Sequence, residues 1–304
     1  MFRQIMVPLD GSALAEGALV YADRLARLAI QRAERSGATI HMVRVVAPVF
    51  IPAPWGTDVY GAIAQDSEAE MLRAAEYLDG LPRRLGATGI QVRAALLTGS
   101  LVAGLLQYEL QEGIDLVVLG SHEQSGLARL SLGSMMHSLL RRGPAPLFVV
   151  PPAINSAHLE HAIVPLDGPA GAERALALLS HLAPAVAHEA TLLRVIGAPG
   201  ETVEAFRYLS RLARRPELAH LSSRCSVERG DPAERIVELG RDRLVVLTKH
   251  RHWTPFHGVS GSISERVLRN GAAALLIARQ GTQTASDDGS GGRPLPSSRF
   301  PRAV

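Results

Sequence analysis

The fold follows from one glycine-punctuated stretch, Gly120-Ser121-His122-Glu123-Gln124-Ser125-Gly126-Leu127-Ala128-Arg129-Leu130-Ser131-Leu132-Gly133-Ser134. The run before it, 116–119, is short, apolar and β-branched, which predicts a buried strand. The residues after it predict a helix with Ser134 as its N-cap and Gly143 at its end. A glycine loop between a strand end and a helix N-terminus exposes backbone N–H groups. This arrangement is typical of an anion site.

The chain also contains an internal repeat. Val7-Pro8-Leu9-Asp10-Gly11 recurs as Val164-Pro165-Leu166-Asp167-Gly168, an offset of 157. Leu116-Val117-Val118-Leu119 recurs as Leu244-Val245-Val246-Leu247, and Gly133-Ser134 as Gly261-Ser262, both at an offset of 128. The second copy is therefore 29 residues shorter (157 − 128), and the loss lies in its middle. This pattern predicts a duplicated domain of ordinary size rather than a solenoid.

Strands and helices alternate in both copies, which predicts an α/β fold. We expect two tandem doubly wound domains, each a mainly parallel five-stranded sheet flanked by helices. The expected boundaries are 1–152 for the first domain, 153–280 for the shorter second domain and 281–304 for a disordered tail. In the first copy a helix is expected over 66–85, after a proline-rich loop over 47–60.

Composition narrows the classes of function. Of 304 residues, 47% are hydrophobic and 20% charged, which is typical of a globular protein. No apolar run is long enough to span a membrane, and the N-terminus enters a strand without a signal peptide, so we expect a cytoplasmic protein. The one cysteine, Cys225, excludes an intramolecular disulfide. A net charge of +3 with 4% aromatic residues does not favour nucleic-acid binding.

The repeat unit resembles the universal stress protein domain, and the chain up to about residue 279 resembles a tandem pair. The resemblance rests on the Val-Pro-Leu-Asp-Gly opening, the second strand, the Gly-Ser loop and the helix-plus-strand ending. It implies ATP with Mg²⁺ in the first domain. Asp10 would lie near the ribose and metal, and the backbone of Val45 would meet the adenine. Gly120, Gly133 and Ser134 match the glycine loop G-x2-G-x9-G-[ST] and would cradle the phosphates.

Two residues of the first loop depart from the family pattern. Glu123 stands at the middle glycine, and a carboxylate beside phosphates repels them unless a cation lies between. Met136 stands where nucleotide-binding members often carry a hydroxyl. In the second copy the first two glycine positions fall on Thr248 and Arg251, and the loop 249–257 is bulky. We therefore expect the second site to be degenerate.

The candidate residues also have structural explanations. An aspartate such as Asp10 commonly accepts backbone N–H groups at a helix start, and Gly120 and Gly133 are compatible with turn geometry alone. The loop histidines His250, His252 and His257 lack a cysteine or carboxylate to complete a metal set. No catalytic residues and no protein metal site are predicted.

Two functions fit these observations. The first is a universal stress protein-like regulator that binds an adenine nucleotide in domain 1 only, with at most weak ATP hydrolysis. The alternative is a non-nucleotide-binding interaction or scaffold module that acts through protein partners or as a homo-oligomer. In both, we expect the two domains to pair about a pseudo-twofold axis through the strands Leu147–Val150 and Leu275–Ala278, because strand edges expose unpaired backbone groups.

Overall fold

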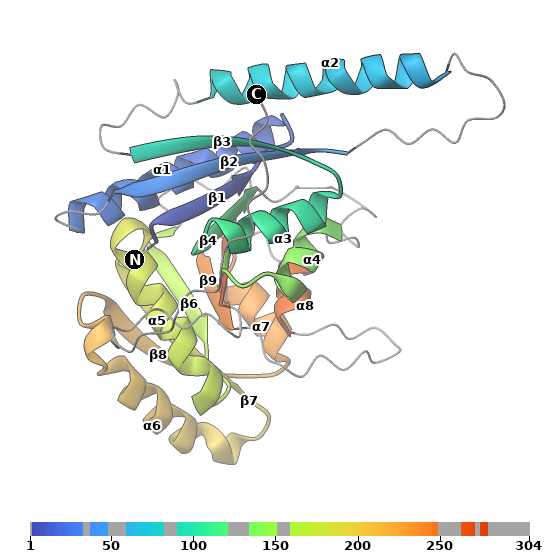
Figure 1. Ribbon diagram of the computed structural model, residues 1–304. Helices are drawn as coiled ribbons and strands as arrows, with labels where there is room; N and C mark the ends of the chain where they lie inside the picture. The colour runs from blue at the N-terminus through green and yellow to red at the C-terminus, as the bar shows by residue number, and fades with distance from the viewer. Residues whose placement is uncertain are drawn as a thin grey trace, which may run out of the picture.

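The computed structural model describes residues 2–32, 37–47, 59–81, 90–120, 134–150, 159–248, 263–270 and 274–278. Within these ranges the chain forms one ten-stranded sheet in the order β3-β2-β1-β4-β5-β10-β9-β6-β7-β8 (Figure 1). The first half holds β1 (Gln4–Pro8), β2 (Ala38–Val46), β3 (Ile90–Thr98), β4 (Leu116–Gly120) and β5 (Leu147–Val150). The second half holds β6 (His161–Pro165), β7 (Glu189–Ile196), β8 (Ser222–Arg229), β9 (Leu244–Thr248) and β10 (Ala274–Ala278). Read inward from its own edge, each half presents its third, second, first, fourth and fifth strands in that order, so the two halves share one topology.

Helices cover both faces of the sheet. The first half has α1 (Ala13–Arg32), α2 (Val59–Gly80), α3 (Leu101–Gln111) and α4 (Ser134–Arg142), and the second has α5 (Pro169–Val186), α6 (Thr202–Ala213), α7 (Pro232–Leu239) and α8 (Ile263–Asn270). Buried side chains of α1, α5 and α6 join one apolar cluster, and those of α3, α4, α7 and α8 join a second. Along β4, Leu116 and Val118 enter the first cluster while Val117 and Leu119 enter the second. This alternation is that of a strand buried on both faces, and the predicted doubly wound α/β class is confirmed.

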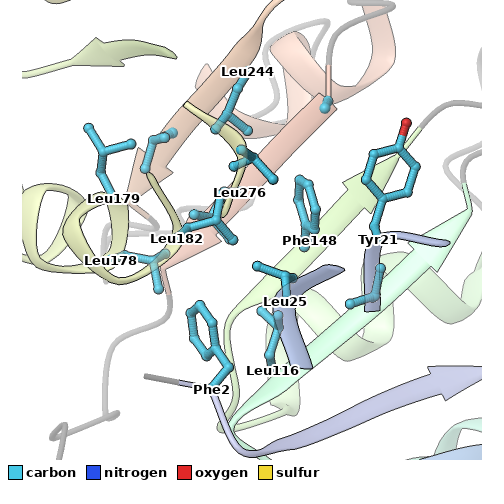
Figure 2. Close-up of a cluster of buried hydrophobic side chains, with 14 of the residues drawn as sticks. Phe2, Tyr21, Leu25, Leu116, Phe148, Leu178, Leu179, Leu182, Leu244 and Leu276 are labelled. Atoms are coloured by element: carbon cyan, nitrogen blue, oxygen red, sulfur yellow. The ribbon is translucent and has the colours of Figure 1, made fainter. Parts of the chain in front are cut away.

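The two halves join through β5 and β10. These strands pair antiparallel, with Phe148 opposite Leu276 and Val149 opposite Leu275, whereas the other strand pairs described are parallel. The predicted pairing of the two final strands is therefore confirmed, and the two expected five-stranded sheets form one continuous sheet. Phe148 packs edge to face on Tyr21 of α1 at 5.9 Å between ring centroids. Figure 2 shows these side chains in a cluster to which both halves contribute.

The bounds of α2 differ most from the sequence prediction. The helix was expected over 66–85 but begins at Val59 and ends at Gly80. Its end precedes Pro82, because a proline disfavours helical geometry in the residue before it. The expected disordered tail lies outside the described residues. None of the described helices is long and apolar enough to cross a membrane.

Candidate functional site

The site predicted in the first half lies where the strand order reverses. From β1 the chain runs outward through β2 and β3, then returns to β4 on the other side of β1. Ligands of open α/β sheets bind at the carboxyl ends of strands at such a reversal. The structure brings Asp10, Val45 and Gly120 to this edge, at or just after the ends of β1, β2 and β4. Ser134 begins α4. Its side chain and the residues 121–133, which include Glu123 and Gly133, lie outside the described part of the structure.

Asp10 shapes the start of α1. Its Oδ1 accepts a hydrogen bond from the backbone N–H of Ser12 at 2.9 Å, and the Ser12 Oγ accepts one from Ala15 at 3.2 Å. Gly11 between them has φ of 89°, a left-handed conformation that favours glycine. The Asp10 side chain is exposed at the sheet edge. It therefore has the structural role expected of a helix-start aspartate and also presents a carboxylate to solvent.

Gly120 is required by close packing rather than by turn geometry. A Cβ at this position would lie 2.5 Å from the backbone carbonyl oxygen of Leu14 and 3.1 Å from its carbonyl carbon. Gly120 is not among the described glycines with positive φ. The absence of a side chain thus lets the first turn of α1 approach the end of β4, and the structural explanation based on a turn is wrong for this residue.

We expect Gly120→Ala to lower the free energy of unfolding by about 1–3 kcal/mol, because the new methyl group meets backbone that cannot rotate away. The measurement is urea unfolding followed by circular dichroism. Gly17→Ala is the matched control: this glycine lies inside α1 with nothing within 4 Å of its added Cβ. That substitution should stabilise the protein by roughly 0.5–1 kcal/mol. Equal stability of Gly120→Ala and wild type would contradict the close approach.

Val45 lies beyond the point at which β1 stops pairing with β2. The last β1–β2 pair is Pro8 with Val43, and Leu9 N–H donates to the Val43 carbonyl at 2.8 Å. Val45 still pairs with Leu97 of β3 on its other side. Its side chain is half-buried against α3. The backbone edge of Val45 that faces the reversal point is therefore outside the β1–β2 ladder.

Two residues at this edge, Arg44 and Tyr77, were not predicted. The Arg44 guanidinium lies 5.2 Å from the centre of the Tyr77 ring. Its Nη1 is 2.9 Å from where a Cβ on Gly11 would stand, so Arg44 covers the turn between β1 and α1. Burial, and secondly the neighbouring Glu16 carboxylate, raise the pKa of Tyr77 to about 12.

The second half repeats this arginine–tyrosine pair. Arg194 lies 5.9 Å from the Tyr208 ring centre and donates to the Leu166 carbonyl at 3.1 Å. The Tyr208 hydroxyl donates to the Gly168 carbonyl at 2.9 Å. The sequence did hold a signal for the arginines, because Arg44 and Arg194 are each followed by valine at matching positions of the repeat.

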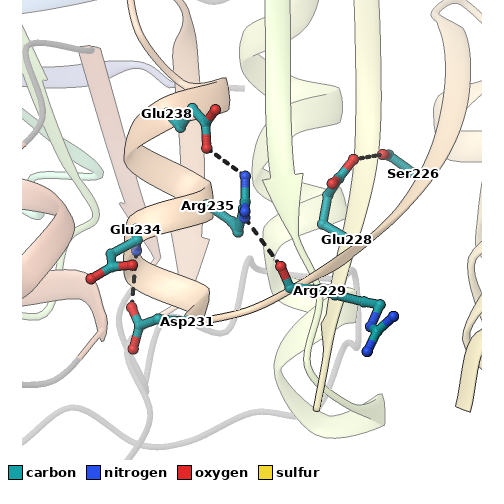
Figure 3. Close-up of polar contacts among 7 residues, drawn as sticks. All are labelled: Ser226, Glu228, Arg229, Asp231, Glu234, Arg235 and Glu238. Carbon is teal, nitrogen blue, oxygen red and sulfur yellow. Dashed lines mark hydrogen bonds and ion pairs between the residues drawn. The ribbon is translucent and has the colours of Figure 1, made fainter. Parts of the chain in front are cut away.

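The second half differs from the first near its own loop. β9 ends at Thr248, where β4 ends at Gly120. Asp231 caps α7 by accepting from the Glu234 N–H at 3.0 Å (Figure 3), and Arg266 of α8 donates to both of its carboxylate oxygens at 2.8 and 2.9 Å. The Arg266 hydrogen bonds lower the pKa of Asp231. The matching position in the first half is Ser100, which makes no side-chain cap hydrogen bond.

Among the described residues no three or more His, Cys, Asp or Glu side chains are arranged to hold a metal ion. The histidines His250, His252 and His257 fall outside that description. Cys225 is half-buried and packs against the first apolar cluster, and burial raises the pKa of its thiol.

These features define a tandem, doubly wound α/β protein with a candidate ligand edge in each half. The model of the universal stress protein family matches residues 1–151. A universal stress protein of Thermus aquaticus is 30% identical over 154 residues, 49% of this chain and 99% of the relative. Universal stress protein Mb2028c of Mycobacterium bovis is 25% identical over 269 residues, 79% of this chain and 86% of the relative. A solved universal stress protein from Archaeoglobus fulgidus superimposes with a TM-score of 0.68 at 15% identity, covering 91% of this chain and 98% of its own. The chain belongs to the universal stress protein family.

Proposed function

We propose that the first half binds an adenine nucleotide, ATP with Mg²⁺, and that the protein is a regulator with at most weak ATP hydrolysis. The observation that supports this most is the gathering of Asp10, Val45 and Gly120 at the reversal point of the strand order. Sites of this kind receive nucleotides because strand ends, helix N-termini and loop N–H groups converge there.

Each residue has a distinct role in this proposal. The exposed Asp10 carboxylate suits a ribose hydroxyl or Mg²⁺, which prefers carboxylate and phosphate oxygens. The backbone edge of Val45 that lies outside the β1–β2 ladder faces the base. The N-terminus of α4 at Ser134, together with Gly120 and Gly133, favours the negative phosphates. Bound Mg²⁺ would supply positive charge that offsets part of the repulsion between the phosphates and Glu123.

We propose further that the equivalent glycine-loop site of the second half is degenerate. Thr248 replaces Gly120, so a side chain stands at the end of β9. The Asp231–Arg266 ion pair also ties α8, the helix after the second loop, to the start of α7.

A scaffold that binds no nucleotide is the second candidate, and Met136 favours it. This residue lies in the first turns of α4 and packs against the second apolar cluster. It therefore contributes to the core and offers no hydroxyl to a phosphate. In this case the function would rest on protein partners or on a homo-oligomer.

Titration of the full chain with MgATP by calorimetry separates the two candidates. We expect wild type to bind, Asp10→Ala to bind weakly, and Glu123→Gly to bind about tenfold more tightly, because the variant loses a carboxylate whose repulsion of the phosphates costs about 1.4 kcal/mol. Asp167→Ala, the matching change in the second half, is the control and should leave affinity unchanged. If folded wild type gives no binding heat, the scaffold candidate is the correct one, and binding by Glu123→Gly alone would then show that the fold retains a site that Glu123 has switched off.

A further inference from the structure

The second half has a pocket of about 650 Å³ at its carboxyl edge. It lies between the turn after β6, the end of β7 and the helix α6. The volume is in the range of small-molecule sites. Ile196 and Ala205 are among the lining residues, and these two residues are only 3% and 7% exposed. The pocket therefore has an apolar component anchored in the core.

Tyr208 is held rigidly in this pocket. The guanidinium groups of Arg194 and Arg211 both lie near its ring, at 5.9 and 5.8 Å from the ring centre. Its hydroxyl donates to the Gly168 carbonyl at 2.9 Å. Arg194 is in turn fixed by its bond to the Leu166 carbonyl. A pre-arranged wall of this kind lowers the entropy cost of binding a ligand.

One end of the pocket is cationic. Arg207 and Arg211 are four residues apart on α6, so they share a face of the helix. Both side chains are exposed, and Arg207 makes no hydrogen bond or ion pair within the described part of the chain. Guanidinium groups bind phosphate oxygens through paired charge-assisted hydrogen bonds. This end is therefore suited to a phosphate.

The other end of the pocket carries acceptors. Glu201 and Glu204 line it near the beginning of α6, and a third carboxylate, that of Asp167, lines it from the turn after β6. Both glutamate side chains are exposed, and neither forms an ion pair with a described residue. Ionised carboxylates only accept hydrogen bonds, so they pair with ligand hydroxyl groups and repel a second phosphate. The charges select a ligand with an anionic end and a hydroxylated end.

The cationic end belongs to the second half alone. When Tyr77 of α2 is matched with Tyr208 of α6, the positions of Arg207 and Arg211 fall on Glu76 and Gly80. The first half thus carries the arginine–tyrosine pair without counterparts of Arg207 and Arg211. The pocket lies at the second half's counterpart of the proposed nucleotide edge, since Asp167 and Gly168, which match Asp10 and Gly11, line it, but its two α6 arginines have no counterpart in the first half.

We propose that this pocket binds a hydroxylated phosphate ester of the sugar phosphate class. The phosphate lies at Arg207 and Arg211, the hydroxyl groups lie at Glu201 and Glu204, and the carbon skeleton lies beside Tyr208. This site is independent of the glycine loops and of the nucleotide proposed for the first half.

Calorimetric titration of the full chain with glucose 6-phosphate tests the proposal. We expect saturable binding that Arg207→Gln and Arg211→Gln each weaken at least about tenfold, through loss of a charged donor to phosphate. Arg214→Gln is the matched control, because Arg214 lies at the end of the same helix and does not line the pocket. It should bind like wild type. Thermal unfolding of the three variants verifies that each is folded.

Three further titrations separate the sources of affinity. Glucose and inorganic phosphate should each bind at least about tenfold more weakly than glucose 6-phosphate, since each lacks one end of the ligand. Asp10→Ala, which tests the nucleotide site, should leave this binding unchanged. The proposal is overturned if folded wild type does not bind glucose 6-phosphate, or if inorganic phosphate binds equally well. It is also overturned if Arg207→Gln and Arg211→Gln leave the binding unchanged, or if MgATP displaces the ligand.

Discussion

Replacing Phe148 with alanine is expected to lower the free energy of unfolding by about 3–5 kcal/mol. The side chain is fully buried at the centre of the β5–β10 junction, opposite Leu276 and edge to face with Tyr21. Truncation removes apolar burial and leaves a cavity that the surrounding sheet cannot close. Because residues of both halves line that space, the loss of stability should affect both halves together (Figure 2).

Urea unfolding followed by circular dichroism measures this effect. We expect one transition in wild type, shifted to lower urea as a whole in Phe148→Ala. Phe206→Ala is the matched control, since Phe206 is 52% exposed on α6 and its loss should cost well under 1 kcal/mol. Two separate transitions, of which only one moves, would show that the halves unfold independently across β5 and β10.

The second large effect is a dependence of stability on pH through Asp115. This carboxylate accepts backbone hydrogen bonds from Arg3 at 2.7 Å and Gln4 at 3.1 Å, and so ties the start of β4 to the start of β1. Burial raises its pKa from the ordinary 3.8 to about 6, although the two backbone hydrogen bonds oppose the rise. The folded state therefore holds this proton more tightly than the unfolded chain.

A raised pKa stabilises the folded protein at low pH, and that contribution is lost as pH rises. Well below pH 3.8 the group is protonated in both states, and between about 4 and 6 the folded state keeps a proton that the unfolded chain has released. A shift of this size corresponds to about 3 kcal/mol lost across that window. Asp115→Asn cannot ionise at this position. Between pH 4 and 7 its free energy of unfolding, relative to that of wild type, should therefore rise by about 3 kcal/mol.

Urea unfolding at four values of pH gives this difference directly, because the other carboxyl groups titrate alike in both proteins. The asparagine also loses one of the two backbone hydrogen bonds, which shifts its curve by a constant and leaves the slope unaffected. The exposed Asp79, changed to asparagine, is the control and should follow the wild-type curve. Parallel curves for Asp115→Asn and wild type would show that the carboxyl is not perturbed.

Much of the fold could be predicted because its signals are local or repeated. The apolar run at 116–119 and its copy at 244–247 have the length and composition of buried strands, and both are strands. The duplication implied two equivalent sheets, and an unpaired final strand in each implied the pairing of β5 with β10. The bounds of α2 were harder to predict, because its helix signal runs into a proline-rich segment on one side and towards Pro82 on the other.

The sequence by itself determined the order of elements, the duplication and the residues that follow each strand, since all of these depend on periodicity and on matching stretches of chain. Only the tertiary structure decided why Gly120 has no side chain and how Arg44 meets Tyr77. It alone placed Arg207 and Arg211 of α6 beside the ends of β6 and β7. These features are contacts between elements far apart in the chain. They depend on how closely helix and sheet approach, a distance that packing sets and that no local pattern encodes.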